Sequence, residues 1–171
     1  MSGGYTGILS VNGRILVAQH DGVYLMKFVG DVRVTLCNTV DHYLDQMFRD
    51  PKFQSVIVDL SRTDGIDSTS LGILAKLSIQ AQERFQFTPT LVSTNPDITR
   101  LLDTMGFDDV FNIVQEPIGN DDDLGELAMK ETTEEAIRQK VLDAHRILMS
   151  LNEHNKVAFQ DLVDTLEACG P

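Results

Sequence analysis

Three hydroxyl side chains and a carboxylate stand together at residues 67–70, which read Asp-Ser-Thr-Ser. The β-branched and apolar residues 56–60 predict a buried strand before them, and the apolar spacing from Leu71 onward predicts a helix after them. Asp67, Ser68 and Thr69 are therefore expected at the N-terminus of a helix. The first backbone N–H groups of a helix have no internal partners and carry partial positive charge. Such a position suits a capping hydroxyl or a phosphate group.

The run Asp-Ser-Thr-Ser-Leu-Gly at residues 67–72 resembles the signature of STAS-domain proteins, the anti-sigma factor antagonists of the SpoIIAA and RsbV type, which reads Asp-Ser-Ser/Thr-Gly-Leu-Gly. The resemblance continues through residues 90–93 and 97–107 and covers about the first two thirds of the chain. It implies that Ser68 is reversibly phosphorylated, with Thr69 as the alternative acceptor. The partner-binding surface is expected to comprise Asp31, Asp64, Asp67, Ser68, Thr69, Ser70 and Ile73.

The resemblance implies partner switching as the function. Unphosphorylated protein would bind an anti-sigma factor or a serine kinase, phosphorylation of Ser68 would end that binding, and a PP2C-type phosphatase would reset the protein. The long acidic tail is similar to HsbA-like and CrsA-like members, which regulate motility and biofilm formation through a response-regulator partner. The alternative is a STAS module that binds a small ligand such as a nucleotide or a lipid, although no GxxxxGK[ST] or GxGxxG phosphate-binding pattern is present.

Two departures from the family motif and one simpler reading bear on this hypothesis. Arg33 replaces the second acidic residue that usually follows Gly30 and Asp31 in the family, which affects the expected kinase contacts. Ser70 replaces a glycine and adds a third hydroxyl to the site. Without the motif, Ser68 would be read as a helix cap and nothing more.

The charge distribution excludes several classes of partner. The net charge is −12, with −4 on residues 1–114 and −8 on residues 115–171. An acidic surface repels nucleic-acid phosphates and anionic lipids, so a protein partner with a basic surface is favoured.

No apolar run is long enough to span a bilayer, and the two cysteines are far apart, which favours a reduced, cytoplasmic setting. The four histidines show no catalytic-triad or metal-ligand spacing, so we expect neither an enzyme nor a bound cofactor or metal.

Residues 1–117 are expected to form the α/β domain, with a mixed β-sheet of STAS type and helices packed on it. The predicted strands are 14–20 and 23–30 around an Asp-Gly turn, the central strand 56–60 followed by a polar loop over 61–66, and short strands at 90–94 and 110–114. The predicted helices are 36–50 with Thr35 as its cap, 68–85, and one that begins at Pro96 and is capped by Gly106.

The texture of the sequence changes after Pro117. Residues 118–131 read as an acidic linker in which 124–131 could form a short helical turn. Residues 132–169 predict a helical extension of two amphipathic helices, the first opened by a capping box from Thr132 to Glu135. Three roles stay open for the extension: packing on the sheet domain, homodimerisation, or binding a partner.

Overall fold

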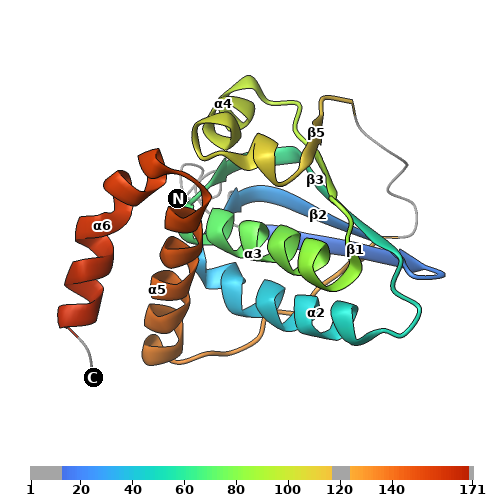
Figure 1. The fold of residues 1–171 in the computed structure, drawn as a ribbon. Coiled ribbons are helices and arrows are strands. Elements are labelled where there is room, and N and C mark those ends of the chain that lie inside the picture. Colours follow the sequence, from blue (N-terminus) through green and yellow to red (C-terminus); the bar gives the residue numbers. More distant parts are fainter. Residues whose placement is uncertain (1–12, 117–123, 170–171) are drawn as a thin grey trace, which may run out of the picture.

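The computed structural model describes residues 13–116 and 124–169, which form a six-stranded mixed sheet with helices packed on it (Figure 1). The strand order is β5-β4-β3-β2-β1-β6. Strands β2 to β5 run parallel, and β1 is antiparallel to both of its neighbours. The predicted α/β fold is confirmed. The strands are β1 (Arg14–His20), β2 (Val23–Val32), β3 (Ser55–Ile66), β4 (Thr90–Val92), β5 (Asn112–Val114) and β6 (Gly125–Glu126).

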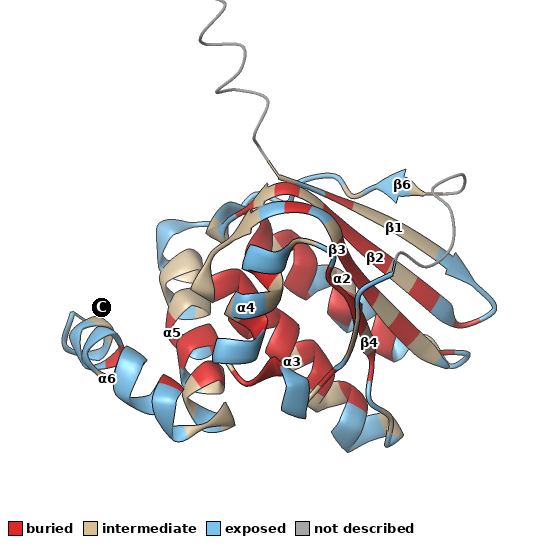
Figure 2. Cartoon of the chain, turned by 90° about the horizontal axis from the view of Figure 1, so that it is seen from above, coloured by how far each residue is buried: buried red, intermediate tan, exposed pale blue. Residues whose placement is uncertain are grey.

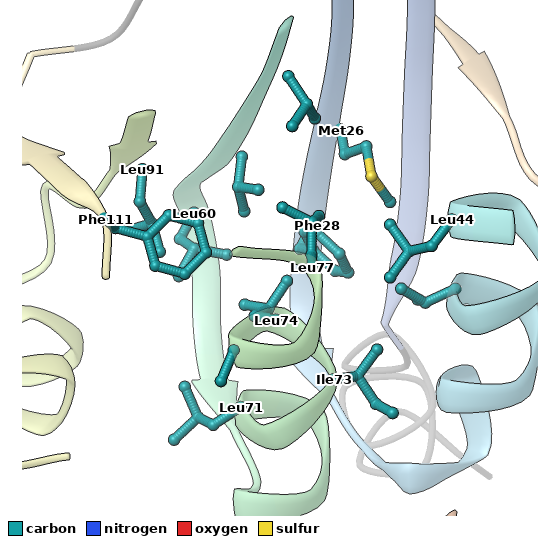
Figure 3. Packing of buried hydrophobic residues seen from close by; sticks show 14 of the residues in the cluster. Met26, Phe28, Leu44, Leu60, Leu71, Ile73, Leu74, Leu77, Leu91 and Phe111 are labelled. Atoms are coloured by element: carbon teal, nitrogen blue, oxygen red, sulfur yellow. The ribbon is translucent and has the colours of Figure 1, made fainter. Parts of the chain in front are cut away.

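Five α-helices complete the described chain, and α2 and α3 lie side by side on one face of the sheet (Figure 1). Buried side chains alternate along β2, where Met26 and Phe28 face the helices, and they meet Leu74 and Leu77 of α3 (Figure 3). This shared core fixes α3 against the strand that precedes it. The helices are α2 (Cys37–Arg49), α3 (Ser68–Phe85), α4 (Pro96–Thr104), α5 (Glu134–Leu151) and α6 (Glu153–Ala168), with 3-10 turns η1 (Val34–Leu36) and η2 (Phe107–Asp109).

The central strand is longer than its apolar sequence predicts. The expected loop over 61–66 continues β3 and pairs with residues 29–32 of β2, which also extends beyond its expected end. Gly30 makes this possible, since it has φ of +86° beside a shift in the pairing register. The two central strands therefore end together where α3 begins.

The C-terminal extension forms two helices, as predicted, and α5 packs across the N-terminal end of α3 (Figure 1). Helix α6 packs on the outer side of α5 and is largely exposed (Figure 2). Asn155 joins the two helices, because its buried side-chain nitrogen donates to the carbonyls of Leu148 and Met105 at 2.8 Å each. Of the three roles left open for the extension, packing on its own sheet domain is the one present in this structure.

Several local expectations are wrong. Helix α2 starts at Cys37 with no side-chain cap, because η1 precedes it in place of a capping Thr35. The cap of α5 is Thr133, whose hydroxyl accepts from the Ala136 amide, one residue later than the predicted capping box. The stretch 124–131 contains no helical turn: β6 pairs with β1 there through backbone hydrogen bonds that side-chain patterns do not signal. Residues 118–123 of the predicted linker lie outside the described residues.

Candidate functional site

Asp67 fixes the start of α3. Its Oδ1 accepts a hydrogen bond from the Ser70 amide at 2.8 Å, so the cap is this carboxylate and not the hydroxyl that the sequence predicted. Its Oδ2 accepts from the Val34 amide, also at 2.8 Å. One carboxylate thus joins the N-terminus of α3 to the turn that precedes α2. The result is a rigid platform for the hydroxyl of the next residue, Ser68.

Replacing Asp67 by Ala is expected to lower the free energy of unfolding by about 2 kcal/mol, because a helix cap is worth about 1 kcal/mol and the Val34 amide also loses its partner. Urea unfolding followed by circular dichroism measures the change. Asp67→Asn is the matched control: it keeps a carbonyl oxygen for the cap but can accept only one of the two bonds in the same geometry, so it should lose about half as much. An Asp67→Ala variant as stable as the wild type would contradict the assigned role.

Ser68 is the first residue of α3, half-buried, and its hydroxyl meets a side chain from the C-terminal extension. The Ser68 Oγ lies 2.7 Å from Nε2 of His145 on α5. The His145 ring is only 2% exposed, and its Nδ1 lies 2.6 Å from the carbonyl oxygen of Val141. A carbonyl can only accept, so Nδ1 carries a hydrogen, and in a neutral ring Nε2 is then the acceptor and Ser68 the donor. Phe159 of α6 packs against the same ring, with centroids 4.9 Å apart.

Sequence reasoning treated His145 as one of four scattered histidines and missed this contact. The available signal is its position between Val141 and Leu148, at a spacing that places all three on one face of a helix. The serine–histidine pair is not a catalytic triad, because the Val141 carbonyl occupies the place of the orienting carboxylate. Over residues 13–116 and 124–169, no cluster of metal-ligating side chains is present.

Three residues predicted on the partner surface lie in the interior. Thr69 and Ser70 are each 5% exposed, and the Ser70 hydroxyl lies 3.6 Å from the Cys37 sulfur. Ile73 is 4% exposed and packs among core side chains (Figure 3). The apolar character of α3 on nearly all sides agrees with this burial, because the helix is covered by the sheet, by α2 and by α5. Thr69 is correspondingly a poor alternative to Ser68 for modification.

The other predicted acidic residues border Ser68 at the ends of the central strands. Asp31 pairs with Gly65 across β2 and β3, and Asp64 is exposed on β3. The Asp31 carboxylate accepts a hydrogen bond from Nε of Arg33 at 2.8 Å. Arg33 thus neutralises the acidic residue that precedes it, and the local surface carries less negative charge than the family pattern would give it.

Cys37 is a buried thiol beneath this site. Burial raises its pKa to about 11, and Asp67 and Asp41 add to the rise, while the hydrogen bond with Ser70 opposes it. At pH 8 only about one thiol in a thousand would then be ionised, and the thiolate is the reactive form. Native protein should therefore titrate quickly with a thiol reagent at exposed Cys169 alone, and Cys37 should react only on unfolding. Equal rates for both thiols would contradict this environment.

The described chain contains no helix that is both long enough and apolar enough to cross a membrane. Residues 14–119 match the model of the STAS domain, which is more than half of the chain. No curated protein sequence matches.

Two solved structures share the fold. One is an anti-sigma factor antagonist from Mycobacterium paratuberculosis, at 22% identity and a TM-score of 0.51, with 60% of this chain and 85% of that one covered. The other is the anti-sigma factor antagonist SpoIIAA in its unphosphorylated form, at 10% identity and a TM-score of 0.50, with 61% and 89% covered. In both cases the uncovered part of this chain is large enough to include the C-terminal hairpin.

Proposed function

Because the chain belongs to the STAS-domain family, we propose that it is an anti-sigma factor antagonist whose partner binding is controlled by phosphorylation of Ser68. The observation that carries the proposal is the position of the Ser68 hydroxyl on the first residue of α3, held by the Asp67 cap at the end of the two central strands. A hydroxyl at such a point can be modified without rearrangement of the sheet domain.

The electrostatics of the helix end support a phosphoryl group on Ser68. A phosphoserine carries about −1.5 to −2 charges at pH 7. The N-terminus of α3 offers partial positive charge from the aligned peptide dipoles of 18 residues. Asp67 and Asp64 stand close in sequence and oppose the added charge in part. Inside the domain the group is therefore tolerated, whereas in an interface it would have to be stripped of water.

The partners in this proposal follow from the family. Unphosphorylated protein binds an anti-sigma factor or a serine kinase, the kinase modifies Ser68, and a PP2C-type phosphatase, carried by a response regulator in the subgroup with an acidic tail, removes the phosphate. The regulated output is transcription, with motility and biofilm formation as the expected processes. The net charge of −12 favours partners with a basic contact surface.

The proposal can be tested on protein purified from its native cell. Phosphosite mapping and intact mass should find a fraction modified at Ser68, and the kinase or anti-sigma factor should copurify with the unmodified fraction only. Ser68→Ala protein, which keeps the first turn of α3 but cannot be modified, should retain the partner under every growth condition. Equal retention by modified and unmodified fractions would refute partner switching, as would a Ser68 that is never modified.

A further inference from the structure

The C-terminal helical hairpin, residues 134–168, covers the hydroxyl on which the proposed function depends. Figure 1 shows α5 alongside α3 at the end where α3 begins. The Ser68 hydroxyl lies within hydrogen-bond distance of His145 of α5, and Phe159 of α6 packs against the imidazole ring in a T-shaped arrangement. A kinase has to bring the γ-phosphate of its nucleotide in line with the Ser68 oxygen, and in this arrangement His145 occupies one side of that oxygen.

The contact between α5 and α3 is closely fitted at Gly72. A Cβ at this position would lie 2.5 Å from both the Cβ and the carbonyl oxygen of Ala144, so only glycine allows the two backbones to approach this far. Glycine inside a helix destabilises the helix relative to alanine. The glycine at position 72 therefore costs helix stability and allows α5 to dock closely. Ala144 itself is fully buried by the contact.

Polar contacts fasten the same hairpin to α2. Lys140 of α5 forms an ion pair with Asp41, which Lys76 of α3 also contacts at 2.6 Å. The segment before α5 is tied down as well, because the Lys130 amide donates to the Thr39 hydroxyl at 2.9 Å. The hairpin therefore contacts both α2 and α3, and it covers the region next to Ser68 that a partner has to reach.

The hairpin is nonetheless a separable part of the molecule. Its four buried hydrophobic residues are few for a structure of two helices, and α6 presents most of its surface to solvent (Figure 2). Neither helix contributes a strand or a hydrogen bond to the pairing of β2 with β3, on which the site is built. The buried hydrophobic residues of the hairpin are Leu142, Ala144, Leu148 and Val163.

A phosphoryl group on Ser68 would crowd the contact between α3 and the docked hairpin. The modification adds a phosphorus and three oxygens to an Oγ whose neighbour, His145 Nε2, is already at 2.7 Å. In a neutral ring whose Nδ1 hydrogen is donated to Val141, Nε2 presents a lone pair to the incoming acceptor oxygens. Both volume and electrostatics therefore oppose the coexistence of phosphoserine 68 with α5 in place.

We propose that α5 and α6 form an intramolecular cover that competes with the partner for the Ser68 face and is released when Ser68 is phosphorylated. Its regulatory meaning rests on the proposed function. In the unmodified protein the closed cover lowers the apparent affinity for the partner, because only the open fraction can bind. In the modified protein the open cover leaves the phosphoserine accessible to a phosphatase.

Hydrogen exchange measured by mass spectrometry on the full chain tests the cover without any partner. Three preparations are compared with the wild type: protein with phosphoserine incorporated at position 68 during translation, Ala144→Arg, and its matched control Ala158→Arg on the exposed side of α6. We expect phosphoserine and Ala144→Arg to accelerate exchange in peptides spanning 137–148 at least tenfold, with β2 and β3 peptides still protected. Ala158→Arg should exchange like the wild type.

Unchanged or slower exchange of α5 in the phosphoserine protein would overturn the proposal, since slower exchange would mean that the phosphoryl group holds α5 in place. If Ala144→Arg unfolds the whole chain, Gly72→Ala applies the same clash from α3 and should release α5 alone. The two proposals fail separately. If a phosphorylation-sensitive partner binds while α5 stays protected from exchange, the cover proposal is refuted and the partner switch stands. If α5 is released but the protein binds no anti-sigma factor or kinase, the partner switch is refuted and the cover stands.

Discussion

Replacing Ser68 by Asp is expected to weaken binding of the anti-sigma factor or kinase several hundred-fold, which corresponds to about 3–4 kcal/mol. A carboxylate at the start of α3 is tolerated by the helix dipole within the domain. In the interface, however, the charge must lose its water, and a partner that contacts a neutral hydroxyl has no need of a cation placed against that one residue. The predicted effect is therefore on affinity, with little change in the free energy of unfolding.

The affinity is best measured in the Ala144→Arg background, by calorimetry with the purified partner. There the hairpin is already displaced, so the comparison of Asp with Ser at position 68 reports the charge alone. In the wild-type background, release of α5 by the Asp side chain should offset part of the loss and give a smaller change. Ser68→Ala is the uncharged control and should bind at least as well as Ser68. Equal affinities of the Asp and Ala variants in both backgrounds would contradict the switch.

The start of α3 could be predicted from the sequence because its determinants are local. A β-branched run, an Asp with hydroxyl residues after it and a helical apolar spacing occupy consecutive residues, and the structure has a helix from Ser68 to Phe85 as expected, although the Asp67 carboxylate caps it in place of a hydroxyl. Pro96 at the first turn of α4 and Gly106 with φ of +86° after it are similarly local signals. Strand β3 is longer than predicted because residues 61–66 pair through backbone hydrogen bonds, which do not depend on their polar side chains.

The Ser68 environment could not be predicted, because it joins residues 77 positions apart in the chain. Whether His145 faces Ser68 or solvent depends on where α5 docks, and the docking depends on the close approach of Gly72 to Ala144. The same docking helps to explain why Ile73 is buried, because α3 is covered on three sides and its apolar residues lie in the core. The motif thus predicted Ser68 as the residue for modification, and the tertiary structure places α5 against it.

Replacing Asp41 by Asn is expected to lower the free energy of unfolding by about 2–3 kcal/mol and to weaken the docking of α5. The Asp41 side chain is 10% exposed and accepts from Lys76 of α3 and Lys140 of α5, whose side chains are 28% and 25% exposed. Removing one partner from a buried ionic contact costs about 3–5 kcal/mol, and the partial exposure of the lysines reduces that figure. The neutral amide would leave two ammonium groups close together without a counter-charge.

The pH dependence of stability provides the decisive measurement for this carboxylate. Burial opposes the ionisation of Asp41, but the hydrogen bonds from Lys140 and Lys76 outweigh it, so its pKa is lowered in the folded protein. A lowered pKa means that the stabilisation is complete above the ordinary aspartate pKa of about 3.9 and is lost as the pH falls through the folded value. The wild type should therefore lose stability relative to Asp41→Asn below about pH 4. Lys140→Met removes only the contact to α5 and should remove a smaller share of the pH dependence. If the stability difference between wild type and Asp41→Asn stays constant across this pH range, the Asp41 carboxylate is not the stabilising group.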